Sequence, residues 1–302
     1  MLSSTKKQNI IAIVGPTASG KSDLAISLAH QFNGEIISAD SRQVYRGMDI
    51  GSGKVTEAEQ KQTKHYLLDV TSPSRQYTVA HFVRDAKRSL QTIYKHGNTP
   101  IICGGTGFWI DTLIYDLPIA TVKPNKKLRK KLSKKSAAEL YGILKKLNPA
   151  RAKTIDKQNP VRLIRAIEIE KAGFLPRLPQ KTTSPYHTLW IGVDPGISRL
   201  KKQIAKRLNS RLRKGMIAEV KRLHASGVSW KRLEELGLEY RYVSRFLQGK
   251  ISRESLRSEL QKEIQRYAKR QRTWFKRNPD IHWIHTAREA KRLARTFLKN
   301  PS

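Results

Sequence analysis

The sequence has little of what several protein classes require. Cys103 is the only cysteine among 302 residues, so no intrachain disulfide can form and no cysteine-rich zinc module is present. No stretch of about 18 apolar residues occurs, which predicts that no helix crosses a membrane. Residues 1–9 are polar and lead into a predicted strand, so they lack the apolar segment of a secretory signal. We expect a cytoplasmic protein without a membrane partner.

Acidic residues are scarce as well. The chain has 24 Asp and Glu against 60 Lys and Arg, which leaves a formal net charge of +36. A charge of this size predicts acidic partners, and nucleic acid is the usual one for a soluble chain. The alternative is that a whole proteome is adapted to an unusual ionic cytoplasm. Either way the charge concerns association and does not determine the fold.

Short apolar runs alternate with amphipathic segments along the first half of the chain. Strands are predicted at 8–14, 35–39, 65–70, 100–103 and 188–193, and helices at 22–32 and 79–95. Strands that alternate with helices form a parallel sheet covered by helices, so the fold class is α/β.

The composition changes between residues 117 and 124. A basic run without acids follows at 123–135, and then come an amphipathic stretch and a predicted helix at 161–172. Asn159-Pro160 is a favourable start for that helix, and Gly173 is a favourable end. We therefore expect a helical insertion at 117–186 in a core formed by 1–116 and 187–302. The last part is mostly helical, and the basic face of the helix expected around 256–275 is either solvated or directed toward RNA.

The first motif that carries chemistry is Gly15-Pro16-Thr17-Ala18-Ser19-Gly20-Lys21-Ser22. It fits the P-loop pattern G-x-x-x-x-G-K-[ST], follows a buried strand and opens a helix. Glycines let backbone N–H groups turn toward phosphate oxygens, and the helix N-terminus adds its dipole. Predicted phosphate-binding residues are Gly15, Thr17, Ala18, Ser19, Gly20, Lys21 and Ser22. The fold is therefore P-loop NTPase-like, although ATP, GTP and a diphosphate ester would each satisfy the motif.

Two further segments end strands at the same predicted edge of the sheet. Asp40 follows the second strand, where open α/β sheets bind ligands, and its carboxylate could bind Mg²⁺, act as a general base or bond its own turn. Gln43 carries a planar amide that suits an adenine edge. Gly104-Gly105-Thr106-Gly107 follows the strand at 100–103. Its glycines would allow close approach of a ligand, or form only a glycine-rich turn.

The order of five segments is similar to that of the tRNA dimethylallyltransferases, also called tRNA isopentenyltransferases. The segments are GPTASGKS, SADSRQVYRGMDIG, GGTGFW, NPVRLIRAIEI and YAKRQRTWF, and the resemblance covers about residues 10–285. No zinc-finger tail is present, as in the bacterial form. Four departures from the family pattern occur. Ser22 replaces a frequent Thr, Gly51-Ser52-Gly53-Lys54 replaces Gly-Thr-Ala-Lys, Asn209 replaces a frequent Asp, and Glu239 lies in a segment expected near RNA.

The resemblance implies prenyl transfer from dimethylallyl diphosphate to N6 of the adenine immediately 3′ of the anticodon. The P-loop would hold the diphosphate, Arg207 would clamp it as it leaves, and Ser22 would bind Mg²⁺. Asp40 would take the proton from N6, and Thr106 would assist. The tRNA anticodon stem-loop would contact a monomer through Asp40, Ser41, Arg42, Gln43, Arg129, Val161, Arg162, Leu163, Ile164 and Arg165.

Three other functions are compatible with part of the sequence. A P-loop kinase of nucleotides or small molecules could use the insertion as a lid. A prenyltransferase of free adenine nucleotides needs neither the insertion nor a charge of +36. A non-catalytic RNA-binding protein would not need the intact Lys21, Ser22, Asp40 and Thr106.

Overall fold

The computed structural model describes residues 7–173 and 184–300. The chain divides into two compact units, residues 1–116 with 183–302 and residues 117–182. The first unit contains a parallel sheet, and the elements described in the second unit are helices. In the described ranges no helix is both long and apolar enough to cross a membrane.

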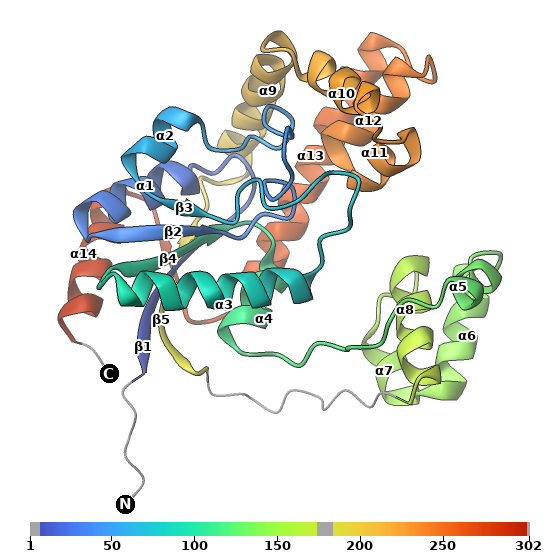
Figure 1. The fold of residues 1–302 in the computed structure, drawn as a ribbon, viewed down its shortest axis with the longest axis horizontal. Coiled ribbons are helices and arrows are strands. Elements are labelled where there is room, and N and C mark those ends of the chain that lie inside the picture. Colours follow the sequence, from blue (N-terminus) through green and yellow to red (C-terminus); the bar gives the residue numbers. More distant parts are fainter. Residues whose placement is uncertain (1–6, 174–183, 301–302) are drawn as a thin grey trace, which may run out of the picture. The chain divides into compact units, whose positions relative to one another are not determined.

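The sheet of the first unit has six strands in the order β3-β2-β4-β1-β5-β6 (Figure 1). The strands are β1 (Gln8–Val14), β2 (Gly34–Ser38), β3 (His65–Tyr66), β4 (Thr99–Gly104), β5 (Tyr186–Val193) and β6 (Ile281–Ile284). All neighbours pair in parallel. The predicted parallel α/β sheet is therefore confirmed, and all its carboxyl ends lie at one edge.

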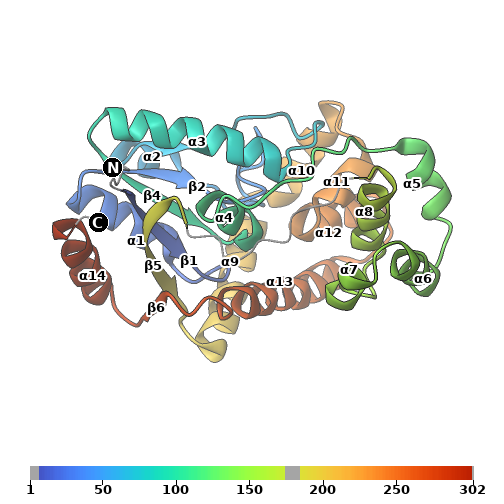
Figure 2. The same ribbon diagram turned by 90° about the horizontal axis from the view of Figure 1, so that it is seen from below.

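Helices cover both faces of this sheet (Figure 2). Helices α1 (Lys21–Gln31) and α14 (Ala287–Lys299) share one apolar cluster with every second residue of the central strands, among them Ile11 and Ile13. Helices α3 (Val79–Lys95) and α4 (Gly107–Ile114) cover the other face, where Phe82 stacks on Trp109 with ring centroids 4.8 Å apart. Burial on both faces explains why β1 is an almost uninterrupted apolar run.

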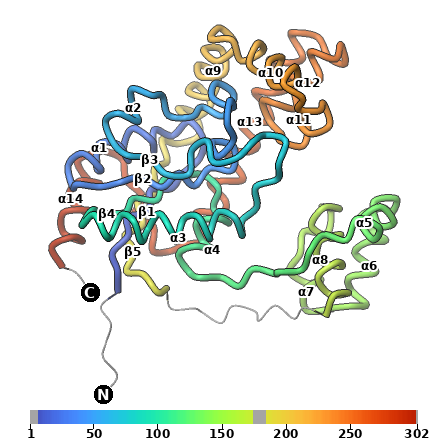
Figure 3. Tube along the Cα trace, in the orientation of Figure 1, coloured from blue at the N-terminus to red at the C-terminus, as the bar shows by residue number. Residues whose placement is uncertain are grey.

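A second group of helices follows β5 in the same unit. Figure 3 traces this path through α9 (Ile197–Arg213), α10 (Met216–Ala225), α11 (Trp230–Leu236), α12 (Leu238–Leu247) and α13 (Arg253–Phe275). They pack on one another, and α13 buries Leu256, Leu260, Ile264, Ala268, Gln271 and Phe275 along one side. Helix α2 (Glu57–Gln62) lies in the long connection between β2 and β3.

The second unit has its own core. It consists of α5 (Lys126–Leu132), α6 (Ala137–Leu147), α7 (Pro149–Thr154) and α8 (Pro160–Lys171). The buried side chains are Leu132, Leu140, Leu144, Ala152, Leu163, Ala166 and Ile167. The Asn159 side chain accepts the Arg162 N–H, and Pro160 begins α8, as the sequence predicted.

Two strands differ from the prediction. The strand expected at 65–70 ends at Tyr66 because Leu67 and Asp69 adopt left-handed φ values of 64° and 54°. Strand β6 was not predicted, since only four residues pair with β5 in a stretch with mostly helical patterns.

Candidate active site

The P-loop takes the backbone conformation that its glycines permit. Gly15 has φ 152°, and a Cβ there would lie 2.4 Å from the Val193 carbonyl oxygen of β5. Gly20, directly before α1, has φ 91°. Ala18 also lies in the left-handed region with φ 63°, a conformation that costs a residue with a Cβ about 1 kcal/mol or more. The loop thus turns sharply between β1 and α1.

A cavity of about 440 Å³ lies against the P-loop. Its wall contains most of the predicted diphosphate-binding residues and two predicted acceptor-side residues: Thr17, Ala18, Ser19, Gly20, Lys21, Ser22, Asp40, Gln43 and Arg207. These residues come from the P-loop, the start of α1, the segment after β2, and α9. The fold therefore brings a phosphate cradle, an arginine and a carboxylate to one cavity.

Two cations of this cavity, Lys21 and Arg207, are poorly compensated. Burial lowers the pKa of Lys21, whose Nζ, among the residues that the structure describes, donates to the Pro16 carbonyl oxygen alone, at 3.1 Å. Burial and the neighbouring Arg211 lower the pKa of Arg207 to about 10. Within the described residues the Arg207 guanidinium forms no hydrogen bond or ion pair, although Glu239 lies close enough to act on its charge. An anion in the cavity would supply the missing partner.

Buried polar atoms without partners also line this region. Ser19 Oγ and Gln203 Oε1 lie in the cavity wall and have no hydrogen bond in the described part of the chain. Nη2 of Arg211, on the next turn of α9, is likewise unpaired there. Buried polar atoms are normally hydrogen-bonded, so a group of exceptions around one cavity indicates a polar ligand.

Asp40 and Thr106 meet through the turn after β2. Oδ1 of Asp40 accepts the Arg42 N–H at 2.8 Å, and Thr106 Oγ1 accepts the Ser41 N–H at 3.2 Å. The carboxylate thus bonds its own turn, as one interpretation predicted. Its second oxygen has no hydrogen-bond partner among the described residues. Asp40 lines the cavity, while Thr106 touches the same turn from β4.

Gln43 and Arg42 are held by the protein itself. Gln43 Oε1 accepts from the Ser38 hydroxyl at 3.1 Å, and its Nε2 donates to the Gly53 carbonyl oxygen at 3.2 Å. Arg42 Nε donates to the Leu236 carbonyl oxygen at 2.5 Å. One acceptor and one donor of Gln43 are therefore already used.

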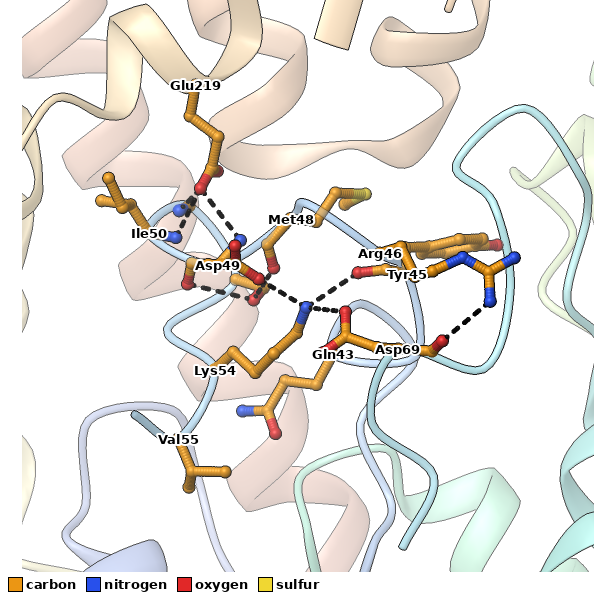
Figure 4. A network of polar contacts seen from close by, with 12 residues as sticks. Gln43, Tyr45, Arg46, Met48, Asp49, Ile50, Lys54, Val55, Asp69 and Glu219 are labelled. Carbon is orange, nitrogen blue, oxygen red and sulfur yellow. Dashed lines mark hydrogen bonds and ion pairs between the residues drawn. The ribbon is translucent and has the colours of Figure 1, made fainter. Parts of the chain in front are cut away.

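A loop at residues 46–54 lies beside the cavity and is fixed by two charged side chains (Figure 4). Lys54, whose side chain is 3% exposed, donates to the Tyr45 carbonyl oxygen at 2.9 Å and to Asp49 and Asp69 at 2.6 and 2.5 Å. Gly53 lies against the arginines of α9, because a Cβ there would lie 2.8 Å from Arg207 Nη2. The loop therefore forms part of the wall beside Arg207.

Glu219 on α10 is the second anchor, and sequence reasoning missed it. Its carboxylate is buried and accepts the backbone N–H groups of three successive residues, Asp49, Ile50 and Gly51, at 2.6 to 3.0 Å. The Tyr240 hydroxyl donates to it at 2.9 Å. No local signal in the sequence distinguishes this glutamate, because all its partners are distant in sequence.

The segment at 236–241 has a different role from the expected one. Tyr240 is almost completely buried, and Glu239 is 8% exposed and pairs with Arg211 at 2.8 Å. The Glu239 acid, which departs from the family pattern in a segment expected near RNA, has its charge neutralised inside the protein. This segment supports the loop at 46–54 and α9.

The glycines of Gly104–Gly107 admit protein atoms. A Cβ on Gly104 would lie 2.2 Å from the Ala39 carbonyl oxygen, and one on Gly107 would lie 2.2 Å from Cδ1 of Trp274. The expectation that these glycines make room for a ligand is wrong at these two positions. Their purpose is to let β2 and α13 pack against the Thr106 turn.

Known proteins are similar to this chain in sequence and fold. The family model described as IPP transferase matches residues 43–278. This chain belongs to that family. It is 42% identical to tRNA dimethylallyltransferase 2 of Trichlorobacter lovleyi over 96% of each chain. Solved tRNA isopentenylpyrophosphate transferases of Staphylococcus epidermidis and Bacillus halodurans are 34% and 31% identical, with TM-scores of 0.72 and 0.73. Each alignment covers 97% of this chain and 99% or 96% of the other.

The family resemblance predicted from five motifs is thereby confirmed, as is its P-loop-like fold. The same comparisons support a transferase and favour neither a kinase nor a non-catalytic RNA-binding protein. Burial raises the pKa of the Cys103 thiol to about 11, which agrees with a small buried thiol in a strand.

In the helical unit the predicted RNA-contacting residues are exposed or half-buried, fully buried, or paired with a glutamate. Val161 is 77% exposed, Arg162 is exposed and Ile164 is half-buried. Leu163 is completely buried, so the prediction that its side chain contacts tRNA is wrong: it belongs to the core. Arg129 and Arg165 both bind the carboxylate of one buried glutamate, Glu168.

Glu168 is the electrostatic centre of the helical unit. Arg129 donates to it through Nε and Nη2 at 3.0 and 2.7 Å, and Arg165 and the Asn125 N–H also donate to it. These bonds lower the pKa of Glu168 to about 2, against the burial that acts in the opposite direction. The Arg129 and Arg165 side chains remain 39% and 31% exposed, so each keeps a solvent-facing side.

Proposed function

We propose that this chain transfers a dimethylallyl group from dimethylallyl diphosphate to N6 of the adenine immediately 3′ of the anticodon in tRNA. Diphosphate is the other product. The observation that carries the proposal is the cavity in which the P-loop, the unpaired Arg207 and Asp40 occur together. It offers an anion cradle and a carboxylate base within reach of one bound substrate.

The cations and hydrogen-bond donors of the cavity suit a diphosphate leaving group. An allylic carbon favours a dissociative path, in which negative charge builds up on the departing diphosphate. Lys21, Arg207 and residues of the P-loop all line the cavity, so they would stabilise that charge as it develops. The unpaired Ser19 hydroxyl adds a further donor to phosphate oxygen. No nucleotide has to be hydrolysed for this reaction.

Asp40 is the proposed base. The exocyclic amine of adenine is a poor nucleophile because its lone pair is delocalised into the ring, so removing a proton while the C–N bond forms assists the reaction. The hydrogen bond from the Arg42 N–H fixes one carboxylate oxygen and leaves the other for the substrate. Thr106, whose Oγ1 accepts the Ser41 N–H of the same turn, would assist.

Mg²⁺ is the proposed cofactor. The Ser22 hydroxyl lines the cavity and is an oxygen ligand of the kind that Mg²⁺ prefers. In the ranges that the structure describes, no cluster of three or more His, Cys, Asp or Glu side chains could hold a metal ion. Diphosphate oxygens and water would therefore complete the coordination. The ion would supply charge neutralisation for the leaving diphosphate.

The helical unit is the proposed site for the anticodon stem-loop. Exposed Arg162, Val161 and the solvent-facing sides of Arg129 and Arg165 offer phosphate contacts and one apolar contact. The acceptor adenine has to leave its stack to reach a cavity of this size. We expect the enzyme to act as a monomer in the cytoplasm.

The test is incubation with unmodified tRNA, Mg²⁺ and dimethylallyl diphosphate, followed by mass spectrometry of the nucleosides. The expected product is N6-dimethylallyl adenosine in tRNA. Asp40→Asn, which keeps the size and the turn-forming oxygen, should lower turnover at least about 100-fold while tRNA binding stays within a few-fold. Prenylation of free AMP in preference to tRNA, or consumption of ATP alone, would contradict the proposal.

A further inference from the structure

Gln271 lies on α13 at the centre of the first unit and has no role in the proposed chemistry so far. Its side chain is 6% exposed. The residue belongs to the buried side of a helix whose other members there are apolar or small, such as Ile264, Ala268 and Phe275. A buried amide in such a row is costly unless its donor and acceptor are both satisfied.

Both ends of the Gln271 amide are satisfied by backbone groups of the candidate site. Oε1 accepts the N–H of Thr17 in the P-loop at 2.8 Å, and Nε2 donates to the Gly105 carbonyl oxygen at 2.9 Å. Gly105 is the residue directly before Thr106. One side chain therefore connects the loop proposed to hold the diphosphate with the turn proposed to act at the acceptor nitrogen.

The contact explains why residue 105 is a glycine. A Cβ on Gly105 would lie 2.2 Å from Gln271 Nε2, whereas its next neighbours, Gln271 Cδ and the Gly15 carbonyl oxygen, would lie at 3.3 and 3.4 Å. The backbone of Gly105 is not in the left-handed region, so the glycine is required by this close approach and not by its φ angle. The Gln271 amide fulfils the other side of the contact, since it offers one acceptor and one donor in a fixed plane.

We propose that Gln271 is a positioning residue that sets the distance between the P-loop and the Thr106 turn. Its effect on the reaction rests on the proposed function. The P-loop holds the diphosphate oxygens, and Asp40 and Thr106 receive the adenine, so the carbon that is attacked and the nitrogen that attacks are aligned only when the two segments keep a fixed separation. A displacement of about 1 Å in such an arrangement is enough to cost roughly 100-fold in rate.

The direct test is Gln271→Met, which keeps the length and volume of the side chain and removes both hydrogen bonds. Gln265→Met is the matched control, since Gln265 lies on the same helix, is half-buried and forms no side-chain hydrogen bond within the described ranges. Single-turnover prenyl transfer to tRNA gives a rate constant and an amplitude, and filter binding gives the tRNA Kd.

In Gln271→Met the rate constant should fall about 10- to 100-fold. The amplitude and the tRNA Kd should stay within twofold of the wild type, and Gln265→Met should react at the wild-type rate. If Gln271→Met lowers the amplitude but not the rate constant, Gln271 affects only the fraction of correctly folded enzyme, and the inference is overturned. A wild-type rate constant would also overturn it. A wild-type enzyme that transfers no prenyl group would instead reject the proposed function.

A second pair of variants tests the contact from the other side and applies even if Gln271→Met does not fold. Gly105→Ala pushes the Gln271 amide away, so it should slow transfer on its own. In a Gln271→Ala background the amide is missing, and Gly105→Ala should add less than a twofold loss. Losses that multiply in the double variant would mean that Gly105 acts independently of Gln271, which contradicts the bridge.

Discussion

Glu168 offers the most quantitative prediction, because one buried carboxylate holds Asn125, Arg129 and Arg165 of the helical unit. The change is Glu168→Gln, which keeps the shape and removes the charge. The wild-type carboxyl has a pKa lowered from 4.5 to about 2. At roughly 1.4 kcal/mol per pKa unit, the ionised form contributes about 3 kcal/mol to the free energy of unfolding of the unit. Removing one partner of a buried ion pair costs a similar amount, about 3–5 kcal/mol.

The pH dependence has a defined sign. A carboxyl whose pKa is lowered by folding contributes its full stabilisation to the folded protein above its unfolded pKa of 4.5. This contribution to the free energy of unfolding is lost as the pH falls toward 2. The difference in the free energy of unfolding between the wild type and Glu168→Gln should therefore decrease steadily between about pH 5 and pH 2. Glu170→Gln is the control, since Glu170 on the same helix pairs with a single arginine, Arg151, at 2.8 Å.

Hydrogen exchange of the intact protein, read by mass spectrometry of peptides from 126–171, reports the opening of this unit separately from the sheet. At pH 6 these peptides should exchange about 100-fold faster in Glu168→Gln than in the wild type, which corresponds to about 3 kcal/mol. The difference should shrink toward pH 3. A difference that stays constant with pH, or one no larger than that of Glu170→Gln, would refute the assignment of Glu168 as the stabilising charge.

Three further predictions concern other sites. Arg207→Gln should raise KM for dimethylallyl diphosphate about 10- to 100-fold in steady-state assays. The midpoint of urea unfolding should be unchanged or higher, because the substitution removes a poorly compensated guanidinium beside Arg211. Glu219→Ala should lower the free energy of unfolding by about 3 kcal/mol or more, and Tyr240→Phe, which removes one donor, by about 1 kcal/mol in the same urea titration. The tRNA Kd, measured by filter binding, should weaken at least about 100-fold from 50 to 200 mM salt, because several phosphate contacts release counterions.

The parts of the fold that follow from local pattern were predictable. The apolar run before Gly15 and the helix opened by Lys21 identify β1 and α1, because burial on both faces and the P-loop spacing leave signals within a few residues. Asp40 and Thr106 were predictable because both follow strands of one parallel sheet. Family motifs added Arg207, which local pattern alone did not single out.

The rest of the site depends on contacts between distant segments. Glu219 and Gln271 lie 168 and 166 positions from Gly51 and Gly105, respectively, and no spacing rule connects such positions. The strand expected at 65–70 ends at Tyr66 because Leu67 and Asp69 have left-handed φ angles, which the composition of the segment does not reveal. Leu163 was misassigned because a motif shows that a segment matters but not which side of its helix is buried.

The hydrogen bond between Thr17 and Gln271 spans 254 positions of the chain. At about 5–20 residues per second, a ribosome makes Gln271 roughly 13 to 50 s after Thr17. During that interval the P-loop has to exist without the helix that fixes it to the Thr106 turn. Strands β1 to β5 are made before Gln271 and β6 after it, so the contact between the P-loop and the Thr106 turn can form only late in the synthesis of the chain.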